Sequence, residues 1–568
     1  MNAQSAWPLG VCIFPEVDLN KARSVNYPKY LGEIIHHAGV CHTPVKFDEL
    51  EAKLDEVRIL LTIGERPFPD AVKTKLNAWL SAGGQWISIA GVCGMEQTIG
   101  VSLPPAYQGF GAGLRTLGEG YLEVKDKSHP MLGHLTRPLH FFSGIALKAS
   151  GAKVTATAQD AHGRSTDTPA VLERAVGKGK ITLIAVDLTG TVVYIQQGHG
   201  ITRDGVPAPD GTAPITDAVL KTGDGGVLDW IFDREPVPGV EGLQCFLNPI
   251  ADQWRELLLR AIFQSAVETK TDLPLLWLYP RNLPAIGTMS HDTDQNVPEF
   301  GRKLLETVNK AGIKTTWCTI LPGYAKAFID ELKADGQELA THYDSMTEGL
   351  PWGKEQVDRQ FNELKKLFGE QPVTNKNHYL RWQGDCEFFE WCEEHGIEMD
   401  QSKGASKTGE AGYNFGTCHP YFPITFDNRM LNVLELCTPT QDLGGVFAPH
   451  ALFEPLLKTV LKNHGVLHLL YHPHHIEKPG VIDSILDAAK RGKESGMEWW
   501  TGRQINTWER SRRKIKWTSS GTKLKSPVAL SDVTVLRLAP SGTGDTNRWG
   551  FAFTAKTKHI HENEEINV

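Results

Sequence analysis

Short apolar runs alternate with helical patterns along the first 240 residues of the chain. The stretches VRILLTIGE (57–65) and QWISIAG (85–91) have the continuous apolar character of buried strands. Residues 69–84 repeat apolar positions at helical spacing, and GKGKITLIAVDL (177–188) predicts a later strand. Strands that alternate with helices form parallel sheets with helices on both faces. Residues 1–240 are therefore predicted to form a doubly wound, parallel-sheet α/β domain.

The same alternation starts again at about residue 275. Seven strands are predicted up to residue 472, and most are separated by amphipathic helices. Their segments are 285–291, 314–320, 337–342, 374–380, 396–400, 432–437 and 465–472. This arrangement favours a barrel over an open sheet, although periodicity alone does not decide between the two. Residues 275–512 are therefore predicted to form a distorted (β/α)7 barrel.

The remaining segments have patterns of their own. Residues 241–274 contain the helical pattern NPIADQWRELLLRAIFQSA and are predicted to be a helical linker between the two domains. The Gly-rich and Pro-rich stretch at 199–217 predicts a long surface loop. Near the C-terminus, VALSDVTVLRLAP and RWGFAFTAK predict a small antiparallel β appendage over residues 513–568.

Length and charge narrow the classes of partner. The chain has 568 residues, and single cores stop growing at about 250 to 300 residues, so more than one domain is expected. The formal net charge is −8, from 59 basic and 67 acidic residues. This balance gives no electrostatic reason to expect a nucleic acid or an anionic membrane as partner. We therefore expect a small or uncharged ligand.

The sequence carries no visible signal for export or membrane insertion. Its first residues lack a basic start before a long apolar run, and no stretch reaches the roughly 18 apolar residues of a spanning helix. Nine cysteines without a CxxC pair indicate reduced thiols rather than a disulfide framework. These features predict a cytoplasmic protein. The sequence does not decide the oligomeric state, so a homo-oligomer stays open.

Polar residues collect where the predicted barrel strands end. Asp292 and Asp294 follow the first strand, His342 ends the third, His378 lies in the fourth, and His472 ends the last. In a βα barrel these strand ends meet at one mouth, where catalytic groups lie. Carboxylates and imidazoles in one cleft suit a divalent metal such as zinc. A pair of aspartates after a strand is also compatible with a helix cap in a solvated turn.

Four motifs in the barrel region resemble those of the polysaccharide deacetylases, the carbohydrate esterase family 4 with its NodB-homology domain. The motifs are SHDTD (290–294), GQELATHYDSM (336–346), NHYLRWQG (377–384) and LHLLYHPHH (467–475), and they occur in the family's order. The resemblance implies a metal-dependent hydrolase of carbon–nitrogen bonds that acts on an N-acetyl group of a sugar.

The resemblance also implies a role for each matched residue. Asp292 would be the general base and Asp294 a metal ligand. His342 would be a second ligand, and Arg381 would orient the base. His472 would be the general acid.

One position departs from the family pattern. The second motif normally supplies two histidines with three residues between them, and Met346 stands four positions after His342. A thioether is a poor zinc ligand beside carboxylate and imidazole, so the third ligand is expected elsewhere. His378 is the predicted third ligand because it lies at the end of the next strand, with Asp344 and His419 as alternatives.

The N-terminal domain carries a second, looser resemblance. AGVCGMEQ (90–97) is similar to the nucleophile elbow of class I glutamine amidotransferases, with Cys93 at the nucleophile position. A working nucleophile would need a histidine backed by a carboxylate, and His199 is the one late candidate. The spacing after Cys93 is also one residue short of the family's. We therefore expect a structural or ligand-binding role for this domain.

Three hypotheses for the function follow from these observations. The leading one is a divalent-metal-dependent hydrolase that removes an acyl group, such as N-acetyl, from a carbohydrate or a related small amide. The second is a hydrolase with the same barrel that cleaves a non-sugar amide without tightly bound metal, which the methionine at position 346 favours. The third is a non-catalytic protein that binds a glycan or serves as a scaffold.

Overall fold

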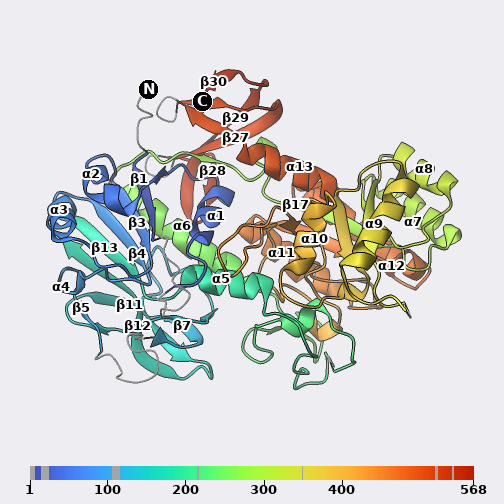
Figure 1. Ribbon diagram of the computed structural model, residues 1–568, viewed down its shortest axis with the longest axis horizontal. Coiled ribbons are helices and arrows are strands. Elements are labelled where there is room, and N and C mark those ends of the chain that lie inside the picture. Colours follow the sequence, from blue (N-terminus) through green and yellow to red (C-terminus); the bar gives the residue numbers. More distant parts are fainter. Residues whose placement is uncertain are drawn as a thin grey trace.

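The structure of the chain is a computed structural model that describes residues 7–14, 25–104, 116–213, 216–347, 349–518, 522–539 and 543–568. Figure 1 shows an N-terminal α/β unit in blue to cyan, a barrel-like unit in yellow to orange, and a C-terminal β-sheet in red above the junction. The predicted α/β class is confirmed: a mixed sheet, a curled parallel sheet and an antiparallel sheet follow one another along the chain.

The N-terminal sheet has nine strands in the order β2-β1-β3-β4-β13-β12-β11-β7-β8. Its first five strands are parallel neighbours: β1 (Leu9–Ile13), β2 (Thr43–Pro44), β3 (Ile59–Ile63), β4 (Gln85–Ile89) and β13 (Gly179–Ile184). The strands predicted at 57–65, 85–91 and 177–188 are β3, β4 and β13. Their apolar residues are buried because helices cover both faces.

The other four strands extend this sheet in antiparallel pairs: β7 (Gly120–Val124), β8 (Leu139–Phe141), β11 (Lys153–Asp160) and β12 (Ser165–Val176). Only Gly177 and Lys178 separate β12 from β13. Parallel neighbours need a crossover of a dozen or more residues, so this short turn forces an antiparallel pair. Gly177 has a φ of 61° in the turn, a conformation that favours glycine. The sheet therefore combines the predicted parallel half with an antiparallel half.

Helices pack on both faces of the N-terminal sheet. One face carries α1 (Tyr30–His37), α5 (Leu188–Gln197) and α6 (Ile250–Glu268), and the other carries α2 (Leu50–Lys53) and α3 (Asp70–Ser81). α6 is the helix predicted in the linker. Its residues Trp254, Leu257 and Phe263 are fully buried in the same core as the sheet. The short helix α4 (Glu96–Ile99) follows β4.

All seven strands predicted for the barrel are present and form one parallel sheet in the order β22-β21-β20-β19-β18-β17-β23. They are β17 (Ile286–Asp292), β18 (Thr316–Thr319), β19 (Glu338–Tyr343), β20 (Thr374–Asn377), β21 (Met399–Asp400), β22 (Leu434–Glu435) and β23 (Val466–Leu470). An eighth strand, β24 (Glu498–Trp499), also pairs with β17. Among the described residues no ladder joins β22 to β23, so the sheet curls into a half-barrel that does not close.

Helices on the outer side complete the βα units of the half-barrel (Figure 1). They are α7 (Pro298–Ala311), α8 (Lys326–Ala334), α9 (Lys354–Phe368), α10 (Glu387–Glu394), α11 (Phe453–Asn463), α12 (Val481–Glu494) and α13 (Gly502–Arg513). α7 shows how the sequence sets such a helix. Pro298 stands at its first position, and Gly312 ends it with a φ of 65°.

The C-terminal residues form the predicted antiparallel β structure. One sheet has the order β16-β27-β29-β28, from β16 (Leu275–Leu276), β27 (Leu530–Leu538), β28 (Thr546–Arg548) and β29 (Phe551–Ile560). A second sheet contains β25 (Lys516–Thr518), β26 (Lys523–Lys525) and β30 (Glu565–Asn567). The ring of Phe553 packs edge-on against Phe263 of α6, with 5.2 Å between the ring centroids. The appendage is therefore attached to the N-terminal unit through α6.

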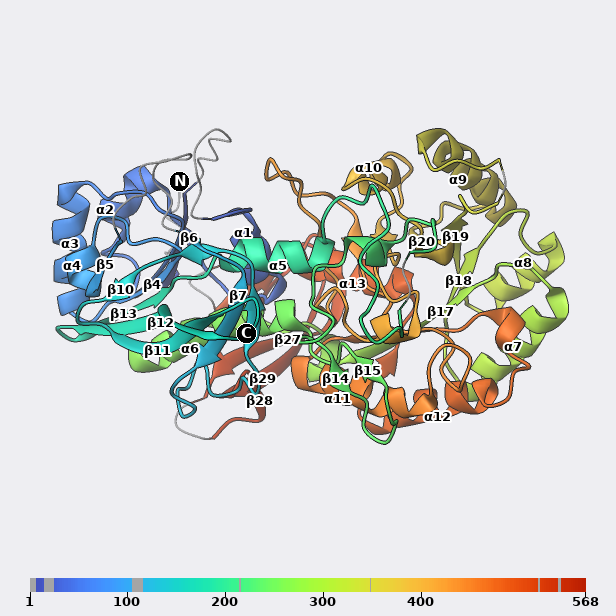
Figure 2. The same cartoon turned by 90° about the horizontal axis from the view of Figure 1, so that it is seen from below.

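A long loop from the N-terminal unit reaches the barrel, as the stretch at 199–217 predicts. It follows α5 and leads to the short pair β14 (Glu235–Pro236) and β15 (Gln244–Cys245), shown in green in Figure 2. Ile201 and Gly384 exchange backbone hydrogen bonds of 2.8 and 2.9 Å, and Lys221 forms a bridge with Arg381. Residues 199–230 are called the bridging loop below.

Two further predictions concern membranes and thiols. In the described part of the chain, no helix is long and apolar enough to cross a membrane. All nine cysteines are buried and none forms a disulfide, as expected for reduced thiols.

Candidate metal centre and active site

The polar residues predicted at the strand ends meet at one edge of the half-barrel. Asp292 is the last residue of β17, and Asp294 lies in the turn that follows it. That turn is tight: Asp294 has a φ of 22° and Asn296 donates its backbone N–H to the carbonyl of Thr293 at 2.7 Å. A non-glycine residue with positive φ costs free energy, and such strain is commonly held at functional sites.

Three predicted metal ligands lie together. The side chains of Asp294, His342 and His378 place one ligand atom each within 4.8 Å of the other two. Nε2 of His342 is 3.2 Å from Oδ1 of Asp294, and Nε2 of His378 is 3.9 Å from Oδ2 of the same carboxylate. Tertiary structure thus brings together residues that are up to 84 positions apart in sequence.

The other ring nitrogen of each histidine is already engaged. Nδ1 of His342 donates to the carbonyl oxygen of Lys376 at 2.8 Å, and Nδ1 of His378 donates to the carboxylate of Asp344 at 2.9 Å. In the neutral rings these bonds leave the lone pair on Nε2, and both Nε2 atoms lie near Asp294. Metal-binding histidines are usually oriented in this way by a carbonyl or a carboxylate.

The fit of these residues to a cation rests on unpaired acceptors. Nε2 of His342 and Oδ1 of Asp294 are buried and have no hydrogen-bond partner among the described residues. When His342 is neutral, its proton is on Nδ1 and both atoms are acceptors; when His342 is protonated, its Nε2–H pairs with Asp294 at 3.2 Å. A cation between them would satisfy both. The chemistry of the donor set, one carboxylate and two imidazoles, fits zinc or a related divalent ion.

The electrostatics favour positive charge at the same point. Burial would lower the pKa of His342, but the carboxylates of Asp292 and Asp294 outweigh burial and raise it. Burial would raise the pKa of Asp294, yet His342, His472 and His378 hold it well below its usual value. A proton or a metal cation would supply the positive charge that this site attracts.

The alternative third ligands lie in other places. Asp344 is bonded to His378 and also accepts the backbone N–H of Met346 at 2.8 Å. Its Oδ1 is therefore engaged by His378 and by the loop backbone. His419 lies in a separate buried cluster with Asp252 and Cys418, where its Nε2 contacts the carbonyl of Asn463 at 2.9 Å.

Lys376, and not Arg381, lies against the predicted base. Nζ of Lys376 is 3.3 Å from Oδ1 of Asp292, and the lysine side chain is completely buried. No ion pair between Arg381 and Asp292 is found in the described part of the chain. The reason is local: Tyr379 and Leu380 have φ values of 60° and 52°, and this turn carries Arg381 to the bridging loop. Lys376 is thus the cation that the structure places beside Asp292, and a role of Arg381 in orienting this base stays a prediction.

His472 is paired with a residue that sequence reasoning missed. Nδ1 of His472 donates to Oδ2 of Asp442 at 2.6 Å, and His475 contacts the same oxygen at 2.9 Å. Burial would lower the pKa of His472, but Asp442 and then Asp294 raise it to about 10. Asp442 follows the short strand β22 in a loop with an apolar neighbour and two glycines, a signal too weak to single it out. His472 lies 3.7 Å from Asp294 through its free Nε2.

One wall of a cavity of about 310 Å³ is lined by Asp292, Asp294, His378, Asp442 and His472. Other parts of its wall come from Tyr379, Ser406, Gln441 and Phe447. A volume near 300 Å³ is at the small end for ligand sites, so the cavity suits one small molecule or one end of a larger one. Tyr379 is 57% exposed at its edge, where a substrate ring could pack.

Cys93, the predicted nucleophile, lies in a tight turn, but its surroundings do not favour a reactive thiol. Cys93 is fully buried with a φ of 55°. The carboxylate of Glu65 accepts the backbone N–H groups of Val92 and Cys93 at 2.6 and 3.0 Å, which are the donors that an oxyanion would need. Burial, followed by the charge of Glu65, raises the pKa of the Cys93 thiol well above its usual value. His199 instead lines a different cavity, described below.

We therefore expect Cys93→Ser to leave any hydrolase activity of the barrel within about twofold of wild type, because a buried thiol beside a carboxylate is a poor nucleophile. The wild-type protein should release no ammonia from glutamine. Both are measured with the purified protein in parallel assays. Glutamine hydrolysis that disappears in Cys93→Ser would contradict the assignment.

Comparison with known proteins gives only a partial likeness. No family model and no curated protein matches the chain. Among solved structures, a candidate polysaccharide deacetylase from Mycobacterium smegmatis is 16% identical, with a TM-score of 0.32 over 41% of this chain and 93% of that one. Puue allantoinase is 13% identical, with a TM-score of 0.32 over 40% and 91% of the two chains. A β-galactosidase from Bacillus circulans matches at 12% identity and a TM-score of 0.25 over 34% and 31%. At these scores the likeness supports no statement about function.

Proposed function

We propose that the half-barrel is a metal-dependent hydrolase that cleaves an acyl group, such as N-acetyl, from the amide of a carbohydrate or a related small molecule. One observation carries the proposal: the side chains of Asp294, His342 and His378 place one ligand atom each within 4.8 Å of the other two, and Nε2 of His342 and Oδ1 of Asp294 are buried without a hydrogen-bond partner among the described residues. The motifs around them, SHDTD and LHLLYHPHH above all, support the choice of reaction.

The residues that would hold the metal are Asp294, His342 and His378. A divalent ion there would polarise the scissile carbonyl and lower the pKa of an attacking water. Three protein ligands leave a coordination position free, as catalytic zinc sites require. Asp344 and the carbonyl of Lys376 would keep the two imidazoles oriented through their Nδ1 atoms.

Asp292 is the proposed general base. Asp292 is 3% exposed, and Nζ of Lys376 lies 3.3 Å from its Oδ1. Nζ of Lys376 lies beside this carboxylate, which is the group proposed to take a proton from the attacking water. Lys376 also donates to Oγ of Ser290, so its position is fixed from two sides.

His472 is the proposed general acid. Asp442 holds it in the charged form and turns its Nε2 towards the cavity, where a leaving amine would need a proton. Asp292 and His472 thus line the same cavity, the first as the group proposed to take a proton and the second as the group proposed to give one. Such a pair is what hydrolysis of an amide requires.

The proposal is tested by metal content and acyl release measured on one preparation. The purified protein should contain close to one transition metal per chain by elemental analysis, and it should release acetate from N-acetylglucosamine oligomers. Chelation should stop this release and readdition of zinc should restore it. Release that persists in metal-free protein would favour the non-metal hydrolase, and metal-free protein that binds the oligomers without turnover would favour the glycan-binding alternative.

Asp442→Asn should lower kcat about 10- to 100-fold, because the neutral amide no longer holds His472 in its protonated form. The sign of the pH effect follows. Asp442 raises the pKa of His472, so its loss lowers that pKa and moves the alkaline fall of activity to lower pH. Kinetics across pH measure both effects. His475→Ala is the matched control, since His475 shares Asp442 but does not contact Asp294; an equal loss in both variants would argue against His472 as the acid.

A further inference from the structure

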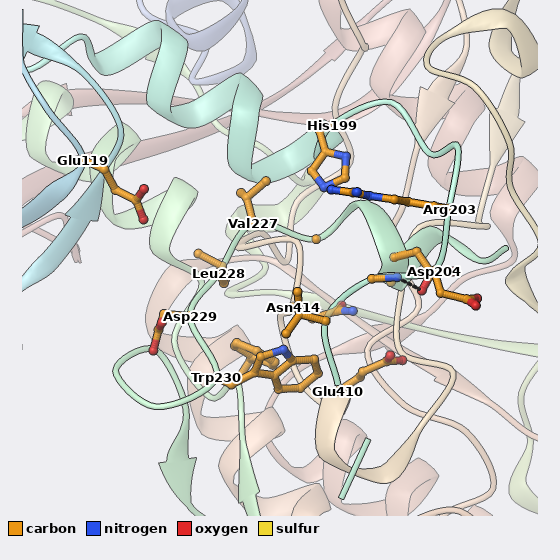
Figure 3. Close-up of a pocket in the computed structure, with 16 residues that line it drawn as sticks. Glu119, His199, Arg203, Asp204, Val227, Leu228, Asp229, Trp230, Glu410 and Asn414 are labelled. Atoms are coloured by element: carbon orange, nitrogen blue, oxygen red, sulfur yellow. Dashed lines mark hydrogen bonds between the residues drawn. The ribbon is translucent and has the colours of Figure 1, made fainter. Parts of the chain in front are cut away.

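A second and larger cavity lies between the N-terminal unit and the half-barrel. Its volume is about 610 Å³, and it is separate from the wall formed by Asp294 and His472. Figure 3 shows Glu119 from the N-terminal sheet on one side, His199 and Arg203 of the bridging loop on another, and Glu410 and Asn414 of the barrel opposite. Trp230 and Phe246 add apolar surface. A cavity of this size is typical of ligand sites.

The barrel wall of this cavity holds two buried acceptors without partners. Glu410 is 2% exposed: its Oε2 accepts from Ser406 N at 2.7 Å and from Lys407 N at 3.0 Å, while Oε1 accepts nothing among the described residues. Asn414 is 6% exposed: its Nδ2 donates to the carbonyl of Gly404 at 3.1 Å, and Oδ1 likewise has no partner there. A buried acceptor left unpaired costs free energy, so a donor placed beside either atom would be stabilising.

The charges around the cavity indicate which kind of hydrogen-bond donor a ligand would carry. Its lining contains five carboxylates, Glu119, Asp204, Asp224, Asp229 and Glu410, against one guanidinium, that of Arg203. Burial raises the pKa of Glu410 above its usual value, and a cation beside it would reverse that shift. The charge of Lys407 offsets part of that rise, and its Nζ is paired with Asp217 at 2.8 Å.

We propose that this cavity binds a small polar molecule with a protonated primary amine, and that its ammonium group lies against Glu410 and Asn414. An ammonium has three N–H donors and no acceptor, which matches a wall of unpaired acceptors. A neutral hydroxyl would add no positive charge beside the buried carboxylate, and an anion would be repelled by it.

The amine site adjoins the proposed active site through one residue. Ser406 lines the smaller cavity, and both its backbone N–H and its hydroxyl donate to Glu410, the hydroxyl at 3.1 Å. Hydrolysis of an amide releases an amine, so a product of the proposed reaction belongs to the same chemical class. The inference itself rests on the larger cavity and does not depend on the hydrolase being active.

Glucosamine and glucose are suitable probes because they differ only in an ammonium or a hydroxyl at one carbon, and neither contains an amide to hydrolyse. Isothermal titration of the full-length protein should show glucosamine binding in the millimolar range or tighter, with glucose at least 10-fold weaker. Glucose that binds as tightly as glucosamine would overturn the proposal, and so would absence of glucosamine binding in that range.

Glu410→Gln tests whether the ammonium group binds at Glu410. The amide oxygen can still accept from Ser406 and Lys407, so the loop keeps its hydrogen bonds, while an N–H group replaces the acceptor in the cavity. Glucosamine affinity should fall roughly 10- to 100-fold, the range for loss of a hydrogen bond to a charged group. Glu51→Gln, an exposed residue of α2 that removes the same charge, should leave affinity unchanged. Equal affinity in wild type and Glu410→Gln would overturn the assignment.

Two more variants keep the test decisive if Glu410→Gln folds poorly. Arg203 is exposed and carries the guanidinium of the cavity lining. Arg203→Gln removes this positive charge, so glucosamine should bind roughly two- to fivefold more tightly. Gly223→Ala would place a methyl carbon 2.8 Å from Oε1 of Glu410, so it keeps the charge and covers the acceptor, and affinity should fall. Weaker binding in Arg203→Gln, or unchanged binding in Gly223→Ala, would contradict an ammonium at Glu410.

Discussion

Asp294→Ala is expected to lose both metal and turnover, whereas Asp292→Asn is expected to lose turnover and keep its metal. Asp292 ends β17 and Asp294 lies in the turn after it, and the loss of each carboxylate has a different consequence. Asp294 contacts both His342 and His378 and belongs to the triad, while Asp292 faces Lys376. Loss of a general base typically lowers the rate 10²- to 10⁴-fold. Loss of one of three ligands should leave no measurable metal after dialysis.

Elemental analysis after dialysis and kcat on the same samples separate these outcomes. Asp483→Asn serves as the control, because Asp483 is an exposed carboxylate on α12 and its loss changes the net charge by the same amount. If Asp294→Ala retained wild-type metal content, the division of roles between the two aspartates would be wrong. If Asp292→Asn retained activity, the base would have to be sought elsewhere in the cavity.

The second large effect concerns the third ligand. His378→Ala should weaken metal binding by a factor comparable to that of His342→Ala, because each ring directs its Nε2 towards Asp294 and has its Nδ1 fixed. Asp344→Asn keeps an acceptor for Nδ1 of His378 but removes the negative charge behind that ring, so its effect should be smaller, about 10- to 100-fold. Competition with a chromophoric chelator measures all three affinities.

Met346→His tests the same metal site by adding an imidazole instead of removing one. The triad is complete without residue 346, so restoring the family's usual histidine should change metal affinity little. Met346 is half-buried in the loop after β19, where its backbone N–H is bonded to Asp344. A strong gain in metal affinity with Met346→His, together with no loss in His378→Ala, would indicate that the site has lost a metal ligand. The non-metal or binding-protein hypothesis would then replace the metal-dependent one.

Much of this site could be predicted from local sequence. Strands buried on both faces of a parallel sheet read as continuous apolar runs, so the polar residues that end them stand out. β17 is buried along all seven of its residues, and Asp292 is the last. The same contrast marks His342 in β19 and His472 after β23. Because parallel strands end at one edge, the pattern also predicted that Asp294, His342 and His378 would meet.

Two residues of the site depended on tertiary structure. Lys376 lies in the middle of a polar strand, TNKN, and nothing local distinguishes it from a solvated lysine. It reaches Asp292 only because β20 curls around the same mouth as β17. Asp442 is 30 positions before His472, in a loop whose path is set by contacts with β23 and not by its own composition. The direction of Arg381 was likewise decided by a two-residue turn with positive φ.

By itself, the sequence determined the α/β class, the seven barrel strands in their order and the polar groups at their ends, because burial and strand length leave periodic signals within a few residues. Only the tertiary structure decided three other features: the antiparallel half of the first sheet, the open edge between β22 and β23, and the cavity between Arg203 and Glu410. Each depends on contacts between segments far apart in the chain. Such contacts are selected by the free energy of the whole packed molecule, and no local pattern records them.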